Sequence, residues 1–342
     1  MYTRREFGKV AISGLTVAAT LPVSRLFAQT VDSTVRGVKL GIIGNGLRGN
    51  PGGRPGGAGA PGAPAAAPPP PPPAPTPGVD PVDLFIEDLK TLGIGNVEST
   101  LNADGQPRLV GGTPQQNTPK TITPEYTQAR EAIRQWRLTA SLDRPRDIAR
   151  KFKAAGINLF SGVVTIEDDC TDQEIDAIFK RLQAMDVKVF CTNGTRVGMG
   201  PRIKPFAEQY KISPAFHTHD ASDDPNEVAS RASLEKLLAM SPQFMINLDI
   251  GHYTAGNQDA LAFVRDHHDR VTHLHVKDRK RDHGPSVMWG TGDTPINQVL
   301  LAIRDNKWPI YCIIERDNRD EQGTPMELTK KYMDYMKRVL ES

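Results

Sequence analysis

The chain has 342 residues, and its 42 lysines and arginines against 40 aspartates and glutamates leave a formal net charge of +2. So small a positive charge argues against nucleic acid or an anionic membrane surface as a partner. A chain of this length, 38% of it hydrophobic, can bury a large core without a disulfide framework. The three cysteines, Cys170, Cys191 and Cys312, show no CxxC spacing, which argues against zinc ribbons and thioredoxin-like redox chemistry.

Residues 1–28 have the pattern of an export signal. A twin arginine, Arg4-Arg5, precedes a mild apolar run from Val10 to Val23, which at about 14 residues is too short to span a bilayer as a helix. This arrangement resembles a Tat signal with cleavage near Ala28, and an ordinary basic N-terminus is the alternative. The resemblance implies a periplasmic or secreted protein that crosses the membrane already folded. We expect no stable membrane span in the mature form, since nothing after residue 30 looks transmembrane.

A glycine-rich segment follows the first predicted strand. Residues 38–49 read as a buried strand that runs into Gly44-x-Gly46-x-x-Gly49, which matches the dinucleotide-binding fingerprint. That fingerprint requires a helix at the third glycine, because the N-terminal amides of the helix hold the pyrophosphate. Residues 50–81 follow instead, with 13 prolines, a density that cannot propagate a helix. We therefore favour a disordered or polyproline-type insertion over residues 50–81, with NAD binding as the alternative.

From residue 81 onward, helical and strand patterns alternate. Apolar spacing and cap signals predict helices over 81–92, 124–138, 146–155, 171–185, 201–210, 226–240, 259–268, 295–306 and from 325 onward. The helix that begins after Thr171 carries a capping box with Glu174. After the first strand, which begins at Val38, short apolar runs predict strands over 96–100, 156–164, 187–192, 212–216, 244–248, 271–276 and 309–314.

The eight predicted strands, nearly all separated by helices, determine the expected fold class. Repeated βα units require a parallel sheet with right-handed crossovers, and eight of them over about 300 residues fit a closed (β/α)8 TIM barrel. We expect this α/β barrel to form one domain over residues 36–342, and an open doubly wound sheet is the alternative.

Polar residues gather at the C-terminal ends of the last four predicted strands, which in such barrels form the active-site face. Strand alternation places His217 with His219, and His273 with His275, on one side of their strands. One aspartate, one glutamate and several imidazoles should thus converge on one mouth: His217, His219, Asp249, His252, His273, His275 and Glu315. Such a mixed set of nitrogen and oxygen donors suits Mn²⁺, Zn²⁺, Co²⁺ or Fe²⁺ better than Ca²⁺.

These residues also have structural interpretations. A single His-x-His on a strand is more often a hydrogen-bonded pair than a pair of ligands, and a lone aspartate at a strand end often caps the next helix. Four such strand ends in succession favour the metal site. Glu98 closes the second strand and could face this site or turn away from it. Trp289 could form a sugar-stacking wall or pack in the core.

Together these segments resemble the xylose isomerase-like TIM-barrel superfamily, which includes sugar phosphate isomerases/epimerases, ketose 3-epimerases, inosose dehydratases and endonuclease IV. The resemblance is strong over residues 140–320 and weak before them. It rests on His217-Thr-His219, Asp249-Ile-Gly-His252, His273-Leu-His275-Val-Lys277-Asp278, Gly290-Thr-Gly292-Asp293 and Glu315.

In the epimerase branch of this superfamily, Glu, Asp, His and Glu hold one divalent metal. Asp249, His275 and Glu315 match the last three, and His217 stands where the branch has its first glutamate. The resemblance therefore implies a cation, Mn, Co, Zn, Fe or Mg, held by His217, Asp249, His275 and Glu315. Epimerases use two carboxylates, one on each face of the carbon atom, so the loss of one puts symmetric two-base epimerisation in doubt.

The resemblance implies a divalent-metal-dependent sugar isomerase/epimerase that removes a proton next to a carbonyl and stabilises an enediolate. Glu315 is the expected base, and His219 or His252 the expected second acid or base. Lys277 is expected to donate either to the developing oxyanion or to an acidic group of the substrate. The expected substrate-binding residues are Glu98, His252, Lys277 and Trp289.

Other functions stay open. Export favours a non-phosphorylated carbohydrate, and the missing glutamate favours a lyase or hydrolase acting on oxidised (3-keto) glycosides or an inosose-type dehydratase. A non-catalytic carbohydrate-binding barrel is a further hypothesis, against which the intact Asp249, His275 and Glu315 argue. Endonuclease IV-like repair would require more metal ligands and a basic groove, so we expect a small-molecule carbohydrate as the partner and no nucleic acid. The sequence does not fix the oligomeric state.

Overall fold

The computed structural model describes residues 30–44, 47, 78–100, 104–107, 109, 122–316 and 322–342. The predicted export signal at residues 1–28, residues 50–77 of the proline-rich insertion and most of the glycine fingerprint lie outside these residues. The predicted C-terminal boundary of the insertion, residue 81, is one residue too far along the chain, because Pro81 is the first residue of helix α2 (Pro81–Leu92). Within the described residues, no helix is long and apolar enough to cross a membrane.

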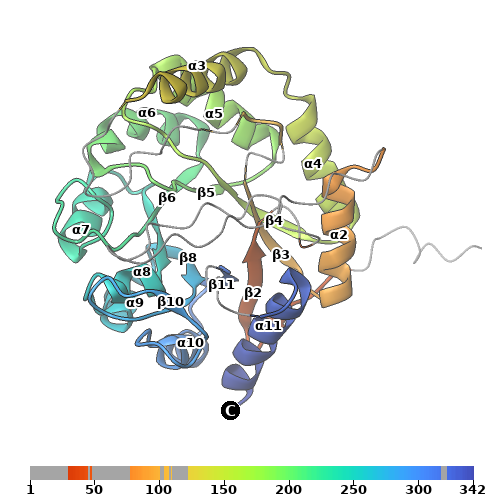
Figure 1. Cartoon of the computed structure of the whole chain (residues 1–342), viewed down its shortest axis with the longest axis vertical. Coiled ribbons are helices and arrows are strands. Elements are labelled where there is room, and N and C mark those ends of the chain that lie inside the picture. Colours follow the sequence, from red (N-terminus) through yellow and green to blue (C-terminus); the bar gives the residue numbers. More distant parts are fainter. Residues whose placement is uncertain are drawn as a thin grey trace, which may run out of the picture.

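Eight parallel strands close into a barrel at the centre of the molecule (Figure 1). In chain order they are β2 (Val38–Ile43), β3 (Asn96–Thr100), β4 (Asn158–Val163), β5 (Val189–Cys191), β6 (Ser213–His217), β7 (Met245–Asp249), β8 (Val271–Val276) and β11 (Tyr311–Ile314). Strand β2 pairs in parallel with both β3 and β11, which closes the ring. The predicted (β/α)8 TIM barrel is confirmed. A short strand, β1 (Thr34–Val35), pairs with β2 in the antiparallel sense.

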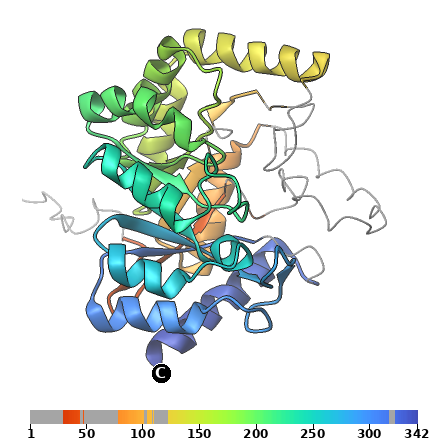
Figure 2. The ribbon, with the colours of Figure 1, turned by 90° about the vertical axis from the view of Figure 1, so that its left-hand side faces the viewer.

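Helices surround the barrel on its outside (Figure 1 and Figure 2). After α2 they are α3 (Pro124–Thr139), α4 (Asp143–Ala154), α5 (Asp172–Ala184), α6 (Gly200–Tyr210), α7 (Arg231–Met240), α9 (Ala260–His267), α10 (Ile296–Asn306) and α11 (Pro325–Glu341). Threonine side chains accept backbone N–H groups at the starts of α3, α5 and α11, which satisfies donors that a helix leaves unpaired. The predicted capping box of Thr171 and Glu174 is confirmed.

The apolar core lies between the barrel and the ring of helices. Helix α5 contributes Ile175, Ile178, Phe179 and Leu182, which recur at helical spacing and are fully buried. The Phe179 ring meets Phe190 of β5 edge to face, with centroids 5.3 Å apart. Burying one such side chain stabilises the fold by about 1.5–3 kcal/mol. This outer core holds the strands in place. The interior of the barrel can therefore contain buried polar side chains, such as those of Glu98, Asn247 and His273.

Two predicted helix boundaries were wrong. Helix α7 begins at Arg231 rather than at 226, because Ser230 caps it and Asn226 instead accepts a hydrogen bond from the Gly198 amide at 2.8 Å. Helix α4 begins at Asp143 rather than at 146. In both cases a local hydrogen bond or charge at the helix start, rather than the apolar spacing, sets the boundary.

Short elements at the C-terminal side of the barrel were not predicted. Helix α8 (Ile250–Ala255) follows β7 directly and is capped by Asp249. A hairpin of β9 (Asp278–Arg279) and β10 (Ser286–Val287) follows β8. A 3-10 helix, η3 (Val197–Met199), precedes α6. Elements of two to six residues are too short for hydrophobic periodicity to reveal.

Candidate functional site

The four residues predicted to hold a metal lie together at the C-terminal ends of four consecutive strands. His217 ends β6, Asp249 ends β7, His275 lies near the end of β8, and Glu315 follows β11. One potential ligand atom from each residue lies within 4.8 Å of those of the others. These four residues, hereafter the cluster, present two imidazoles and two carboxylates, a donor set that suits first-row transition metals.

Strand register determines which neighbours the cluster has. In the parallel pairings His217 is aligned with Asn247, and Asp249 with His275. Because side chains alternate along a strand, Asn247 lies on the same face as Asp249, and His273 on the same face as His275. Asn247 and His273 come two residues before Asp249 and His275 on their strands. They therefore lie closer to the N-terminal end of the barrel, beneath those two residues.

Lys277, directly after β8, joins the two carboxylates of the cluster. Its Nζ lies 2.8 Å from Asp249 Oδ2 and 3.3 Å from Glu315 Oε1. The other oxygen of Asp249 accepts the backbone N–H of His252 at 2.7 Å and so starts helix α8. Asp249 therefore caps a helix with one oxygen and faces the cluster with the other. Asp249 and Lys277 are buried, whereas the side chain of Glu315 is 20% exposed.

The described residues in and beneath the cluster carry an excess of negative charge. Glu98, Asp249 and Glu315 contribute three carboxylates, whereas Lys277, which pairs with Asp249 and Glu315, contributes one ammonium group. About two further positive charges are therefore needed for balance. Burial raises the pKa of Asp249 to about 7. Burial lowers the pKa of His275, but Glu98 and Glu315 outweigh it and raise that pKa to about 10. These directions allow a proton on His275 and, below about pH 7, a proton on Asp249 to supply the missing charges.

A divalent cation would supply the same two positive charges. Asp249 Oδ2 is ion-paired with Lys277 at 2.8 Å, and His275 Nδ1 with Glu315 Oε2 at 2.9 Å. Among the described residues these three buried atoms nevertheless have no hydrogen bond of good geometry, which leaves their hydrogen-bonding capacity incompletely used. A cation bound by the cluster would partner all three atoms and neutralise the charge, so the residues present fit a divalent metal.

Glu98 lies beneath the cluster rather than at the mouth, which argues against its predicted role in substrate binding. It is fully buried on β3. Its Oε2 lies 2.5 Å from His275 Nε2, and its Oε1 lies 3.1 Å from His273 Nε2 and 2.9 Å from Ser161 Oγ. Burial raises the pKa of Glu98, but the two imidazoles outweigh this and hold the pKa below its usual range. An ionised carboxylate only accepts, so all three neighbours donate to it.

His219 and His252, the predicted second acid or base, border the cluster. Nitrogen atoms of His217, His219 and His252 lie within 4.8 Å of one another. Arg279 Nη1 lies 2.5 Å from His252 Nδ1; because a guanidinium only donates, Nδ1 accepts and the ring proton sits on Nε2. Burial, followed by the charge of Lys277, holds the pKa of His252 well below its usual range. His252 is therefore a neutral N–H donor.

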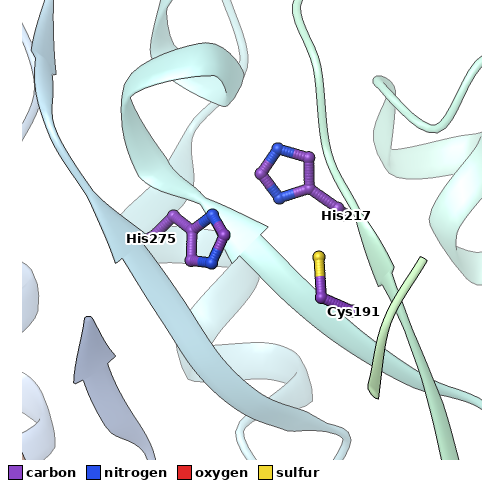
Figure 3. Close-up of side chains that lie close together, drawn as sticks. All are labelled: Cys191, His217 and His275. Carbon is purple, nitrogen blue, oxygen red and sulfur yellow. The ribbon is translucent and has the colours of Figure 1, made fainter. Parts of the chain in front are cut away.

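Cys191, to which the sequence assigned no role, lies beside the two imidazoles of the cluster. It is buried at the end of β5, and its Sγ lies within 4.8 Å of a ring nitrogen of both His217 and His275. Figure 3 shows the three side chains gathered from three different strands. A thiolate at this place would add a soft ligand. A single cysteine at a strand end has no spacing that could have revealed it.

Asn247 and Arg279 are two further residues beside the site that the sequence analysis missed. Asn247 Oδ1 lies 2.6 Å from His217 Nδ1, and Arg279 also pairs with Asp220 at 3.0 Å. One signal was available for Asn247, because it interrupts the apolar run 244–248 of a predicted buried strand. For Arg279 the signal is weaker, since a basic residue after a strand is common on protein surfaces.

Trp289 packs against helix α11, which argues against the sugar-stacking wall and supports the core-packing alternative. Its ring stacks on Tyr332 with centroids 4.3 Å apart and meets Tyr335 edge to face at 5.8 Å. Only 7% of Trp289 is exposed. The two tyrosines therefore cover the ring that a sugar would need.

A cavity of about 530 Å³ lies outside the barrel, where α3, α5 and α6 meet. Its lining includes Leu138, Arg181 and Phe206 and none of the cluster residues. The Arg181 guanidinium there is already paired with Asp104 at 2.6 Å. We place the functional site at the cluster, because the convergent donors and displaced pKa values are found there.

The chain is similar to inosose dehydratases over part of its length. It is 22% identical over 153 residues to the inosose dehydratase of Lactiplantibacillus plantarum, covering 39% of this chain and 50% of that protein. It is 25% identical over 155 residues to the inosose dehydratase of Clostridium perfringens (strain 13), covering 40% and 51%. The chain spans about half the length of the curated relatives it matches.

Solved structures share the fold, and a family model matches the sequence. A xylose isomerase domain protein from Alicyclobacillus acidocaldarius superposes with a TM-score of 0.53 at 11% identity, covering 76% of this chain and 95% of that one. The D-psicose 3-epimerase of Clostridium cellulolyticum superposes with a TM-score of 0.53 at 13% identity, covering 76% and 94%. The model of the xylose isomerase-like TIM barrel family matches residues 108–339. The chain belongs to the xylose isomerase-like TIM barrel family.

Proposed function

We propose that the protein is a divalent-metal-dependent enzyme that removes a proton next to a carbonyl group of a carbohydrate or cyclitol and then expels a hydroxyl group, as a dehydratase does. The asymmetry of the cluster carries the proposal. Of its two carboxylates, Glu315 has a partly exposed side chain and Asp249 is fully buried, so the cluster offers one carboxylate base at the mouth. The partial similarity to inosose dehydratases supports the same reaction class.

A divalent cation held by His217, Asp249, His275 and Glu315 would polarise the carbonyl group of the substrate and acidify the neighbouring C–H bond. Lys277 would also stabilise the negative charge that develops on the carbonyl oxygen, because its buried ammonium group can donate a hydrogen bond to that oxygen. Lys277 is already positioned at the cluster by Asp249 at 2.8 Å.

Glu315 is the proposed base. Burial raises its pKa, but Lys277 and His275 outweigh this and hold the pKa well below its usual range. The carboxylate is therefore ionised at neutral pH and able to take the proton. Glu315 follows the last strand of the barrel and reaches the mouth. Its side chain is more exposed than those of His217, Asp249 and His275, the cluster residues on the preceding three strands.

The leaving hydroxyl group requires a proton, which an imidazole at the mouth can donate. We assign this role to His219, and His252 would hold a substrate hydroxyl through its Nε2–H. The electron pair of the broken C–H bond forms the new double bond, and the C–O bond breaks. The hydroxyl group leaves as water with the proton from the imidazole, and the product is an unsaturated ketone.

A sugar isomerase or epimerase is the second candidate function. His219 and His252 lie beside His217, with the ring centroids of His217 and His219 4.9 Å apart. An imidazole there could return a proton to the carbon atom after Glu315 has removed it. This reaction would differ from that of the two-carboxylate epimerases by using one carboxylate and one imidazole.

Product analysis in D₂O distinguishes the two reactions. Protein loaded with Mn²⁺, Co²⁺ or Zn²⁺ would be incubated with a keto-inositol, a 3-keto-glycoside and free ketoses. The proposal predicts loss of water or of the aglycone, seen as the ultraviolet absorbance of an unsaturated ketone. Deuterium incorporated without any loss would support the epimerase instead. Metal-loaded protein that converts none of these compounds would contradict both.

Glu315→Gln should lower kcat by about 10³-fold or more, because the amide keeps the shape of the side chain but cannot accept the proton. The measurement is the steady-state rate on the substrate identified above, with a thermal melt to show that the fold is intact. Glu235→Gln, at an exposed glutamate on α7, is the matched control and should keep the wild-type rate. A Glu315→Gln rate close to that of the wild type would remove the base assignment.

A further inference from the structure

We propose that Glu98 and Asn247 are positioning residues that determine which ring nitrogen of each histidine faces the cation: Nδ1 of His275 and Nε2 of His217. Neither belongs to the cluster itself. The inference rests on the metal site of the proposed function and goes beyond it, because it assigns outer partners and opposite tautomers to the two histidines.

Glu98 determines the orientation of His275. The Glu98 Oε2 atom accepts the Nε2–H of His275 at 2.5 Å, so this nitrogen carries a proton and cannot ligate a metal. The remaining nitrogen, Nδ1, faces Glu315 Oε2 at 2.9 Å. The ligand atom that His275 offers to the cluster is therefore Nδ1.

The carboxylate of Glu98 is itself held in place. Its second oxygen, Oε1, accepts hydrogen bonds from Ser161 Oγ at 2.9 Å and His273 Nε2 at 3.1 Å. His273 is fixed in turn, since its Nδ1 lies 2.7 Å from Thr272 Oγ1. With three donors from two other strands, the fully buried Glu98 cannot rotate without leaving one of them unpaired. This gives His275 a rigid outer partner.

Asn247 determines the orientation of His217 in the opposite sense. Asn247 Oδ1 lies 2.6 Å from His217 Nδ1, and an amide oxygen only accepts, so Nδ1 carries the proton. Nε2 keeps its lone pair for the cation. Asn247 is fully buried and aligned with His217 in the pairing of β6 with β7, so the contact follows from strand register rather than from a mobile loop.

Outer partners of this kind orient a metal-binding imidazole and fix its tautomer, and their loss weakens metal affinity by about 10- to 100-fold. Glu98 and Asn247 act on different histidines through different strands. Removing the accepting oxygen of either residue should therefore weaken cation binding, independently of the other residue.

The test combines metal titration with NMR of the full protein. Co²⁺ affinity would be measured by chelator competition for the wild type, Glu98→Leu, Asn247→Leu and Asn247→Asp. Glu174→Gln is the matched control, because Glu174 is equally buried but lies on α5, where it pairs with Arg130. Thermal melts would show which variants fold.

We expect Glu98→Leu and Asn247→Leu, which remove the accepting oxygens, to bind Co²⁺ about 10- to 100-fold more weakly than the wild type. Asn247→Asp keeps the accepting oxygen and should stay within about threefold. Glu174→Gln should lower the melting temperature and leave Co²⁺ affinity unchanged. Equal affinity in wild type, Glu98→Leu and Asn247→Leu would overturn the assignment while leaving the metal site standing.

NMR provides a readout that needs no variant to fold. In Zn²⁺-loaded protein labelled with ¹⁵N-histidine, long-range ¹H–¹⁵N spectra should show the proton of His275 on Nε2 and that of His217 on Nδ1. The reverse pattern at either ring would overturn the inference. A wild type that binds neither Co²⁺ nor Zn²⁺ would overturn the inference and the proposed function together.

Discussion

At the scale of single residues, the proposed dication would take the place of two protons in the cluster. Asp249 and His275 are both buried, and both have a pKa raised above its ordinary value, to about 7 and about 10. For Asp249 the main cause is burial, whereas for His275 the carboxylates of Glu98 and Glu315 outweigh burial. A cation that binds these two residues must displace their protons, which links metal affinity to pH.

Cation affinity should therefore rise with pH. Below about pH 7 both protons must leave when the cation binds, and between about pH 7 and pH 10 only the proton of His275 must leave. Binding of Co²⁺ should be at least about tenfold tighter at about pH 8 than at about pH 6. Calorimetry in buffers of different ionisation enthalpy would count the released protons. A dissociation constant that does not change over this range would show that these two groups are not ligands.

Removing one imidazole should lower metal content. His217→Ala takes away one of four proposed ligands and should reduce the bound metal severalfold, measured by elemental analysis after dialysis. His267→Ala, at the end of α9 and away from the cluster, is the control and should retain wild-type content. If the metal content of His217→Ala is unchanged, His217 is not a ligand, and the ligand must be assigned to His219 or to another residue.

At the scale of elements, hydrophobic runs, caps and strand ends made much of the barrel predictable. These signals are local, so eight strands and the convergence of His217, Asp249, His275 and Glu315 could be inferred before any coordinates. The contacts of Glu98 and Asn247 could not, because they depend on which strands become neighbours when the sheet closes. Helix α8 was not predicted because its six residues make fewer than two helical turns, too few for a periodic pattern.

Caps that were read from the sequence should have measurable energies. Thr171→Ala removes the side chain that accepts the Glu174 amide at the start of α5, so it should lower the free energy of unfolding by about 1 kcal/mol. Thr139→Ala, near the exposed end of α3, is the control and should change it by less than about 0.5 kcal/mol. Urea denaturation measures both. Equal losses in the two variants would argue against a specific role of the cap.

At the scale of the whole molecule, the barrel separates stability from chemistry. Apolar side chains fill the space between strands and helices, and the described donors of the cluster lie inside the ring at its C-terminal end. This division is consistent with an identity of only 22–25% to the curated relatives over about half of their length. It also explains why the fold indicates where the site lies but not which reaction takes place there.

The proposed export signal belongs to the same scale, because export would determine the compartment in which the barrel meets its substrate. Replacing Arg4 and Arg5 with lysines should keep the full chain in the cytoplasm, since Tat-type export requires the twin arginine. Cell fractionation and blotting would measure this, and Arg25→Lys, just after the apolar run, is the control that should leave export unchanged. Periplasmic protein in the Arg4→Lys/Arg5→Lys variant would contradict a Tat signal.

Anomalous scattering from crystals of the protein loaded with Co²⁺ or Zn²⁺ tests the central claim most directly. The account predicts one strong peak within coordination distance of His217, Asp249, His275 and Glu315, with Nε2 of His217 and Nδ1 of His275 facing it. A peak elsewhere, or these four side chains facing one another with no ion between them at saturating metal, would contradict it.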